Sequence, residues 1–107
     1  IKLLVVACNT ASAHALTKLR LLFNIPIIGV IEPGAEKAVA VSRNQRMAVL
    51  GTKGTIQSGA YQAAILKRAP NAVIFPVACP LFVPLVEEQW LHHPASTLIV
   101  REYLQPL

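Results

Sequence analysis

The sequence predicts an α/β protein with an open, mainly parallel sheet and helices on both faces of it. Short β-rich apolar runs alternate with segments whose apolar residues recur at helical spacing, and Gly, Pro, Asn and Thr mark many of the junctions. Alternation of this kind is typical of parallel sheets covered by helices.

The first half of the chain is predicted to hold two strand–helix units. Ile1–Ala7 is an apolar run of the kind buried on both faces of a parallel sheet. Asn9-Thr10-Ala11-Ser12 favours a helix start and precedes Ala13–Phe23, where apolar residues have helical spacing. The second unit comprises a strand over Ile25–Ile31, closed by Glu32-Pro33-Gly34, and a short helix over Ala35–Val41.

The second half is predicted to repeat the alternation. A strand over Met47–Leu50 leads through the turn Gly51–Thr55 into a helix over Ile56–Arg68. After a strand over Val73–Val77, Pro80 suits the first turn of a helix at Leu81–Gln89, where its missing N–H costs nothing. His92-His93-Pro94 interrupts the pattern before a last helix over Ala95–Leu107.

The composition and charge of the chain limit which partners and which cellular compartment are expected. With 54% hydrophobic and 14% charged residues, the chain has material for a core, and part of its surface is expected to face a missing segment or a partner. The net charge of +5 comes from scattered Lys and Arg and is accompanied by only six aromatics, so nucleic acid is not an expected partner. An acidic small molecule fits this charge at least as well. No apolar stretch approaches a membrane span, and two distant cysteines without metal-ligand spacing favour free thiols in a reducing cytoplasm.

Three predicted strand-to-helix turns carry polar chemistry: Cys8-Asn9-Thr10, Gly51–Thr55 and Cys79-Pro80. Ligands of open α/β sheets bind at such turns, beyond the carboxyl ends of the strands. Cys8 would lie at the positive end of a helix, which favours the thiolate, although a small buried apolar residue is an equally open interpretation. Asn9 and Thr10 offer amide and hydroxyl groups there, and helix capping is compatible with that role.

The other turns are less specific. Gly51-Thr52-Lys53-Gly54-Thr55 lacks the glycine spacing of a phosphate loop, and both a carboxylate or phosphate site and a plain capped helix remain open for it. Cys79 precedes a proline, which removes one anion donor, so a structural role is favoured. Glu87 is interpreted as a surface residue on pattern alone, His92 and His93 as loop residues without a metal, and His14 as a partly exposed packing residue.

Four segments together resemble the glutamate racemases, within the aspartate/glutamate racemase superfamily. They are Val5-Val6-Ala7-Cys8-Asn9-Thr10-Ala11-Ser12, Pro26-Ile27-Ile28-Gly29-Val30-Ile31-Glu32-Pro33-Gly34, Gly51-Thr52-Lys53-Gly54-Thr55-Ile56-Gln57-Ser58 and Ala78-Cys79-Pro80-Leu81-Phe82-Val83-Pro84-Leu85-Val86-Glu87. They occur in the family's order and cover essentially the whole chain.

The resemblance implies cofactor-independent interconversion of L- and D-glutamate in the cytoplasm, supplying D-glutamate for peptidoglycan and so for cell wall and cell shape. It implies Cys8 as one of two catalytic cysteines, and Asn9, Thr10, Thr52, Thr55 and Glu87 as substrate-binding or nearby residues, with no metal. The expected partners are glutamate and a second copy in a homodimer.

The resemblance also implies that the second catalytic cysteine belongs to a Gly-Cys-Thr-His motif, which Cys79-Pro80-Leu81-Phe82 does not match. We therefore expect these residues to be the central part of a two-lobe enzyme and to be inactive alone. Residues 1–24 would form a strand–helix unit of the first lobe and residues 25–107 an incomplete second lobe. The rival hypotheses are a non-catalytic small-anion-binding α/β module and a purely structural lobe.

Overall fold

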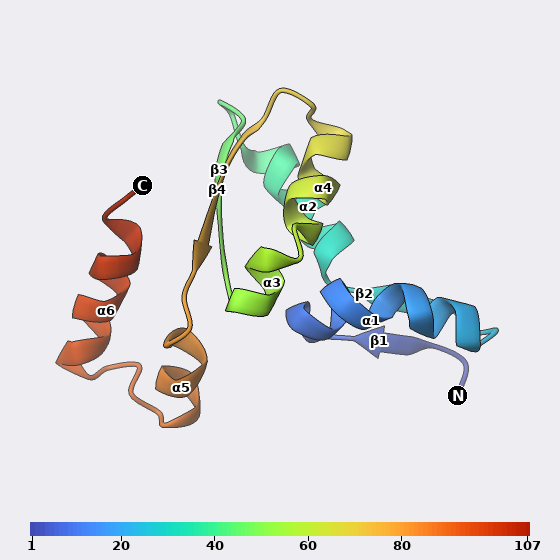
Figure 1. The fold of residues 1–107 in the computed structure, drawn as a ribbon, viewed down its shortest axis with the longest axis horizontal. Helices are drawn as coiled ribbons and strands as arrows, with labels where there is room; N and C mark the ends of the chain where they lie inside the picture. The colour runs from blue at the N-terminus through green and yellow to red at the C-terminus, as the bar shows by residue number, and fades with distance from the viewer.

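The computed structural model describes all 107 residues as four strands and six helices (Figure 1). In chain order they are β1 (Leu4–Val6), α1 (Asn9–Leu22), β2 (Ile27–Gly29), α2 (Ile31–Val41), β3 (Arg46–Gly51), α3 (Lys53–Gln57), α4 (Ala60–Arg68), β4 (Val73–Ala78), α5 (Phe82–Glu87) and α6 (Pro94–Leu104). The predicted α/β class is confirmed.

All strand pairing is parallel, as predicted, but the strands form two separate sheets. β1 pairs with β2 from Leu4↔Ile27 to Val6↔Gly29, and β3 pairs with β4 from Arg46↔Val73 to Gly51↔Ala78. The two sheets lie in different parts of the molecule, joined by α2 (Figure 1). The division into lobes between residues 24 and 25 stays a prediction. Residues 27–29, which that division places in the second lobe, form hydrogen bonds to β1 of the first.

The main core lies between β3 and the helices α2 and α4, which pack together on one face of the β3–β4 sheet (Figure 1). Met47 and Val49 alternate with exposed neighbours along β3, so their side chains point to this face. Ile65 of α4 is 1% exposed and fills the centre of the cluster. Burying a side chain of this size stabilises the fold by about 1.5–3 kcal/mol.

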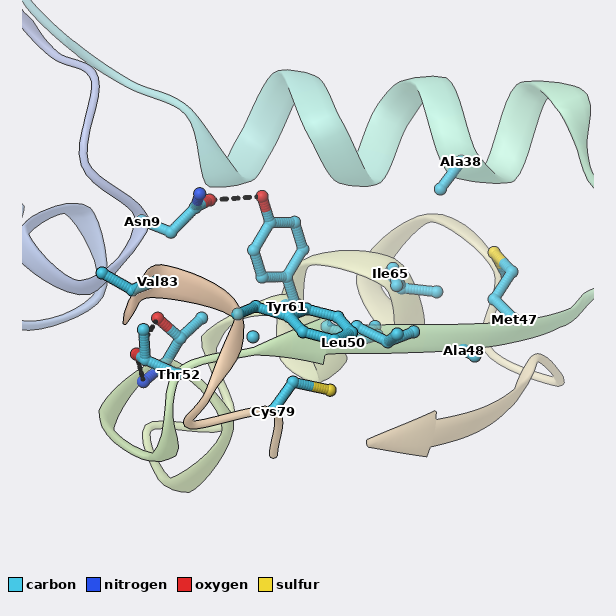
Figure 2. A pocket seen from close by; sticks show the side chains of 14 residues that line it. Asn9, Ala38, Met47, Ala48, Leu50, Thr52, Tyr61, Ile65, Cys79 and Val83 are labelled. Atoms are coloured by element: carbon cyan, nitrogen blue, oxygen red, sulfur yellow. Dashed lines mark hydrogen bonds between the residues drawn. The ribbon is translucent and has the colours of Figure 1, made fainter. Parts of the chain in front are cut away.

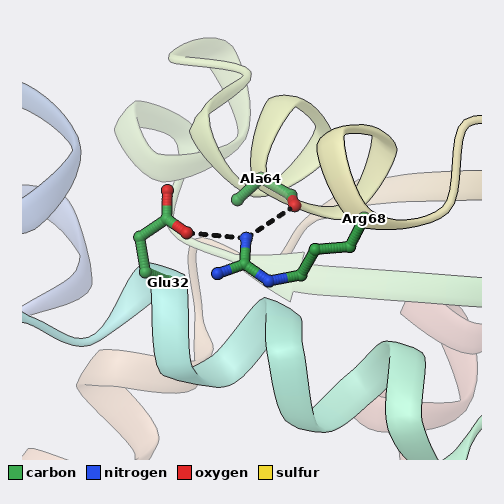
Figure 3. A network of polar contacts seen from close by, with 3 residues as sticks. All are labelled: Glu32, Ala64 and Arg68. Carbon is green, nitrogen blue, oxygen red and sulfur yellow. Dashed lines mark hydrogen bonds and ion pairs between the residues drawn. The ribbon is translucent and has the colours of Figure 1, made fainter.

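A salt bridge joins the beginning of α2 to the end of α4. Arg68 Nη1 lies 2.6 Å from Glu32 Oε2 and also donates to the carbonyl oxygen of Ala64 at 3.1 Å (Figure 3). The carboxylate of Glu32 is half exposed, so solvent screens the pair and its contribution is about 0–1 kcal/mol.

Two helix boundaries differ from the prediction. Glu32-Pro33-Gly34 lies in the first turn of α2 rather than closing a strand. Proline is tolerated there because the first N–H groups of a helix have no partner within it. The helix predicted over Ile56–Arg68 is two helices, because Gly59 adopts a left-handed conformation with φ 66° between them.

The C-terminal helices also begin and end at other residues than predicted. α5 begins at Phe82, so Pro80 lies in the preceding turn rather than in the first turn of the helix, and α5 ends at Glu87. α6 begins at Pro94, where the Nδ1 atom of His93 accepts from the N–H of Ala95 at 3.2 Å. It stops at Leu104, three residues before the predicted end. None of the helices is long and apolar enough to cross a membrane.

Candidate functional site

The site forms where the carboxyl ends of β1 and β3 meet. Cys8-Asn9-Thr10 follows β1 and opens α1, while Thr52 follows β3 and precedes α3. Thr10 and Thr52 are 42 residues apart in sequence, yet their side chains are in contact. Two of the three polar turns that the sequence indicates, Cys8-Asn9-Thr10 and Gly51–Thr55, therefore lie side by side.

Three threonine hydroxyls form a closed cluster, here called the threonine triangle: Thr10, Thr52 and Thr55. The Oγ1 atom of Thr10 lies 2.9 Å from that of Thr52 and 3.1 Å from that of Thr55. The third side of the triangle, between Thr52 and Thr55, measures 3.0 Å. Each hydroxyl can donate one proton and accept another, so the triangle satisfies all three donors internally. A carboxylate entering here would replace one of these bonds.

Thr52 has a second role in its own helix. It is the N-cap of α3, and its Oγ1 accepts from the N–H of Thr55 at 3.2 Å. The capping interpretation of this turn is therefore correct, and the hydroxyl remains part of the triangle. Thr55 is 2% exposed, whereas Thr10 and Thr52 are partly exposed. Within the triangle, solvent thus has access to Thr10 and Thr52.

Asn9 and Thr10 do not cap their helix. The N-cap of α1 is Cys8, whose side chain makes no capping hydrogen bond. The side chains of Asn9 and Thr10 instead reach other elements: Asn9 Oδ1 accepts from the hydroxyl of Tyr61 at 2.7 Å, and Thr10 joins the triangle. Both polar side chains therefore point across the junction between the two sheets.

A cavity of about 390 Å³ lies beside this junction (Figure 2). β3 lines it along its length, and the side chains of Ala38, Ile65 and Phe82 contribute from α2, α4 and α5. Its surface is mostly apolar, and its polar side chains are Asn9, Thr52, Thr55 and Tyr61. An apolar cleft with a few convergent polar groups is the usual form of a small-molecule site.

Cys8 is exposed and does not itself line the cavity, but it directly precedes Asn9, which does. Its backbone is extended, and its carbonyl oxygen accepts from the N–H of Ser12 at 2.8 Å, which starts the 14-residue α1. Ser12 is buried and joins β1 to the segment after β2: its hydroxyl donates to the carbonyl of Val6 at 2.9 Å and accepts from the N–H of Val30 at 3.3 Å. The exposed thiol therefore stands on a firmly held turn at the positive end of a helix.

Cys79, unlike Cys8, is buried. It is 2% exposed, its N–H donates to the carbonyl oxygen of Gly51 at 2.8 Å, and burial raises the pKa of its thiol. A protonated, buried thiol is a poor nucleophile and a poor base. This environment agrees with the structural role that its proline neighbour suggested.

Glu87 is not brought to the threonine triangle. It is the last residue of α5, its side chain is exposed and has no hydrogen-bond or salt-bridge partner, and it does not line the cavity. His92 is exposed, while His93 stacks on Trp90 with ring centroids 4.5 Å apart. No three His, Cys, Asp or Glu side chains are grouped so that they could hold a metal ion.

Sequence patterns missed two residues at this junction. Tyr61 in α4 contacts Asn9, and the Nε2 atom of His14 lies 3.2 Å from the carbonyl oxygen of Gly54. Tyr61 is the second residue of α4 and His14 lies within α1, and their partners are 52 and 40 residues away, so no local pattern marks them. His14 is exposed rather than partly exposed, and its ring links α1 to α3.

Comparison with known proteins agrees with this geometry. Residues 1–93 match the family model of the Asp/Glu/hydantoin racemases. The chain belongs to this family. It is 54% identical over 107 residues to a glutamate racemase of Geobacter metallireducens, and 54% identical over 100 residues to one of Staphylococcus epidermidis. It covers 40% and 38% of the length of these two relatives.

Solved structures of racemases have the same fold. A glutamate racemase isoform from Bacillus anthracis superposes with a TM-score of 0.93 at 40% identity, covering 99% of this racemase-family chain and 40% of that one. A glutamate racemase from Francisella tularensis, solved in complex with D-glutamate, gives a TM-score of 0.90 at 33% identity, with coverages of 98% and 39%. The predicted resemblance to glutamate racemases is therefore confirmed.

Proposed function

We propose that the protein to which these residues belong is a glutamate racemase that interconverts L- and D-glutamate without a cofactor. The observation that carries the proposal is the meeting of an exposed cysteine turn, Cys8-Asn9-Thr10, with Thr52 beside a mostly apolar cleft. The glutamate racemases named above support the choice of substrate. Those same relatives give no support to a non-catalytic anion-binding module.

In the proposed mechanism Cys8 acts from one face of the substrate. Its thiolate removes the α-proton, leaving a carbanion at Cα and a neutral thiol. An acid on the opposite face then donates a proton to Cα, which inverts the configuration at Cα. The enzyme gains one proton at Cys8 and loses one at the opposite acid, so its total number of protons is unchanged. The α-proton is very weakly acidic, so the surroundings must stabilise the carbanion.

In this proposal only one of the two catalytic groups, Cys8, lies among these residues. Cys79 is buried with a protonated thiol, and its neighbours do not match the family's second cysteine motif. We therefore assign the opposite acid to another part of the longer enzyme. The apolar cavity beside Asn9 would exclude water from the carbanion.

The binding groups follow from their chemistry. The amide of Asn9 and the hydroxyls of Thr10 and Thr52 would hold the amino-acid end of glutamate. Thr55 would act mainly by holding the other two hydroxyls, because it is buried beneath them. Glu87 would approach the substrate only in the assembled enzyme.

The cellular role belongs to the same proposal. D-glutamate made in the cytoplasm would supply peptidoglycan synthesis and so cell wall formation and cell shape. The two-lobe enzyme would act as a homodimer, without nucleic acid or membrane partners.

The decisive experiment replaces Cys8 by serine in the full-length protein and follows L-glutamate by circular dichroism. Turnover should fall by about 10²–10⁴-fold or more, because a general base is removed from the reacting face. Cys79→Ser is the matched control and should retain activity in its folded fraction. Near-normal turnover by the Cys8 variant would contradict the assignment of the base, and an inactive wild-type protein would contradict the function itself.

A further inference from the structure

The hydroxyl of Tyr61 donates to the carboxamide oxygen of Asn9 at 2.7 Å (Figure 2). This bond crosses from the second residue of α4 to the first residue of α1, a separation of 52 residues. Both side chains line the cavity. Burial raises the pKa of Tyr61, so its hydroxyl keeps its proton and stays a donor at physiological pH.

The position of the Tyr61 ring depends on a glycine in a third element. A methyl group at Gly34, in the first turn of α2, would lie 3.1 Å from the Tyr61 hydroxyl oxygen and 3.2 Å from Cε1. Both distances are tighter than ordinary van der Waals contact. The ring is therefore packed directly against the backbone of α2, in space that only glycine leaves free.

The bond to Tyr61 decides what Asn9 can offer a ligand. A carboxamide has an acceptor oxygen and a donor NH₂ group. With its oxygen bonded to Tyr61, Asn9 presents its two N–H donors. A carboxylate, which only accepts, matches those donors, whereas an ammonium group, which only donates, does not.

We propose that Tyr61 is a positioning residue that fixes the orientation of the Asn9 carboxamide and so commits Asn9 to the α-carboxylate of the substrate. This inference rests on the proposed function. Tyr61 acts through Asn9 and does not touch the reacting atoms. Its loss should therefore weaken binding more than it slows proton transfer.

The test is Tyr61→Phe in the full-length enzyme, which keeps the ring and removes only the hydroxyl. The KM for glutamate should rise about three- to tenfold while kcat changes less than about twofold, because a hydrogen bond that orients a binding group is lost. Tyr103→Phe is the matched control. Its hydroxyl also makes a hydrogen bond, with the N–H of Leu81 at 3.3 Å, but it does not line the cavity, so KM should not change.

A double-mutant cycle separates positioning from a general effect on packing. In an Asn9→Ala background, Tyr61→Phe should have little further effect on KM, because there is no carboxamide left to orient. Gly34→Ala should raise KM in the same direction as Tyr61→Phe, because the added methyl displaces the ring. An unchanged KM in Tyr61→Phe, or an undiminished effect in the Asn9→Ala background, would overturn the proposal.

A readout independent of turnover keeps this inference distinct from the proposed function. The side-chain NH₂ resonances of Asn9, assigned in ¹⁵N-labelled full-length protein, should shift in Tyr61→Phe and remain unchanged in Tyr103→Phe. If the wild-type protein does not racemise glutamate, the proposed function fails, and these resonances still decide whether Tyr61 holds Asn9. Unshifted Asn9 resonances in Tyr61→Phe would show that it does not.

Discussion

Replacing Thr55 by valine tests whether the threonine triangle stabilises the junction between the two sheets. Valine has nearly the same shape as threonine but cannot form the bonds of 3.1 Å to Thr10 and 3.0 Å to Thr52. The bond of 2.9 Å between Thr10 and Thr52 would remain. The substitution therefore removes two hydrogen bonds at a residue that is only 2% exposed.

The expected loss of stability follows from these contacts. Each hydrogen bond contributes about 0.5–1.5 kcal/mol net, so two account for about 1–3 kcal/mol. The additional buried methyl group of valine returns about 0.8 kcal/mol. We therefore expect the free energy of unfolding to fall by about 0.2–2.2 kcal/mol, with about 1.2 kcal/mol at the centre of that range.

Urea unfolding of the full-length protein measures this difference, provided that the slope with denaturant is unchanged. Thr17→Val is the matched control, because Thr17 lies exposed on α1 and makes no side-chain hydrogen bond, and its effect should stay within about 0.5 kcal/mol. In a Thr10→Val background, Thr55→Val should cost less, since one of its two bonds is already lost. A neutral Thr55→Val variant, or strictly additive effects, would refute a cooperative hydroxyl cluster.

Three further predictions concern the thiols and the tyrosine. Cys79→Ser should lower stability by about 1–3 kcal/mol, because a buried hydroxyl needs a partner that the thiol does not; denaturation measures this, and an unchanged midpoint would contradict it. Iodoacetamide at neutral pH should modify exposed Cys8 before buried Cys79, as mass spectrometry of the native protein can establish; equal rates would contradict the described burial. Burial raises the pKa of Tyr61 above 10.0 and that of Cys79 above 9.0. The folded protein therefore keeps these two protons at pH values at which the unfolded chain has lost them. The stability that these two groups contribute is complete below the unfolded pKa values and is lost as pH rises toward the raised ones. The free energy of unfolding should thus fall above about pH 9, less steeply in Tyr61→Phe, and equal slopes would contradict this.

The sequence was sufficient for the features that depend on local pattern. Apolar runs such as Ile1–Ala7 and the helical spacing over Ala13–Phe23 indicated the alternation, because side-chain period reflects backbone conformation directly. Cys8 at a strand end was found in the same way. The segment predicted as a turn over Gly51–Thr55 is a strand-to-helix junction, with β3 ending at Gly51 and α3 beginning at Lys53. The parallel pairing followed from alternation, since parallel strands need a crossover between them.

Other boundaries needed information beyond the local pattern. Residues 56–68 have a helical pattern throughout, and the break at Gly59 depends on a left-handed conformation that glycine allows but does not require. The first turn of α2 contains Pro33, which is equally compatible with a turn after a strand. In both cases the residues permit two conformations, and the sequence pattern alone does not distinguish between them.

The sequence by itself determined the alternation of strands and helices and the residue types at the end of each strand. Only the tertiary structure decided that the four strands divide into two sheets, that Thr10 meets Thr52 and Thr55, and that Tyr61 holds Asn9. The physical reason is that periodicity records the conformation of each segment and the face that it buries. Which hydroxyl meets which amide depends on how segments 40 to 50 residues apart pack together, and that packing is a property of the whole fold.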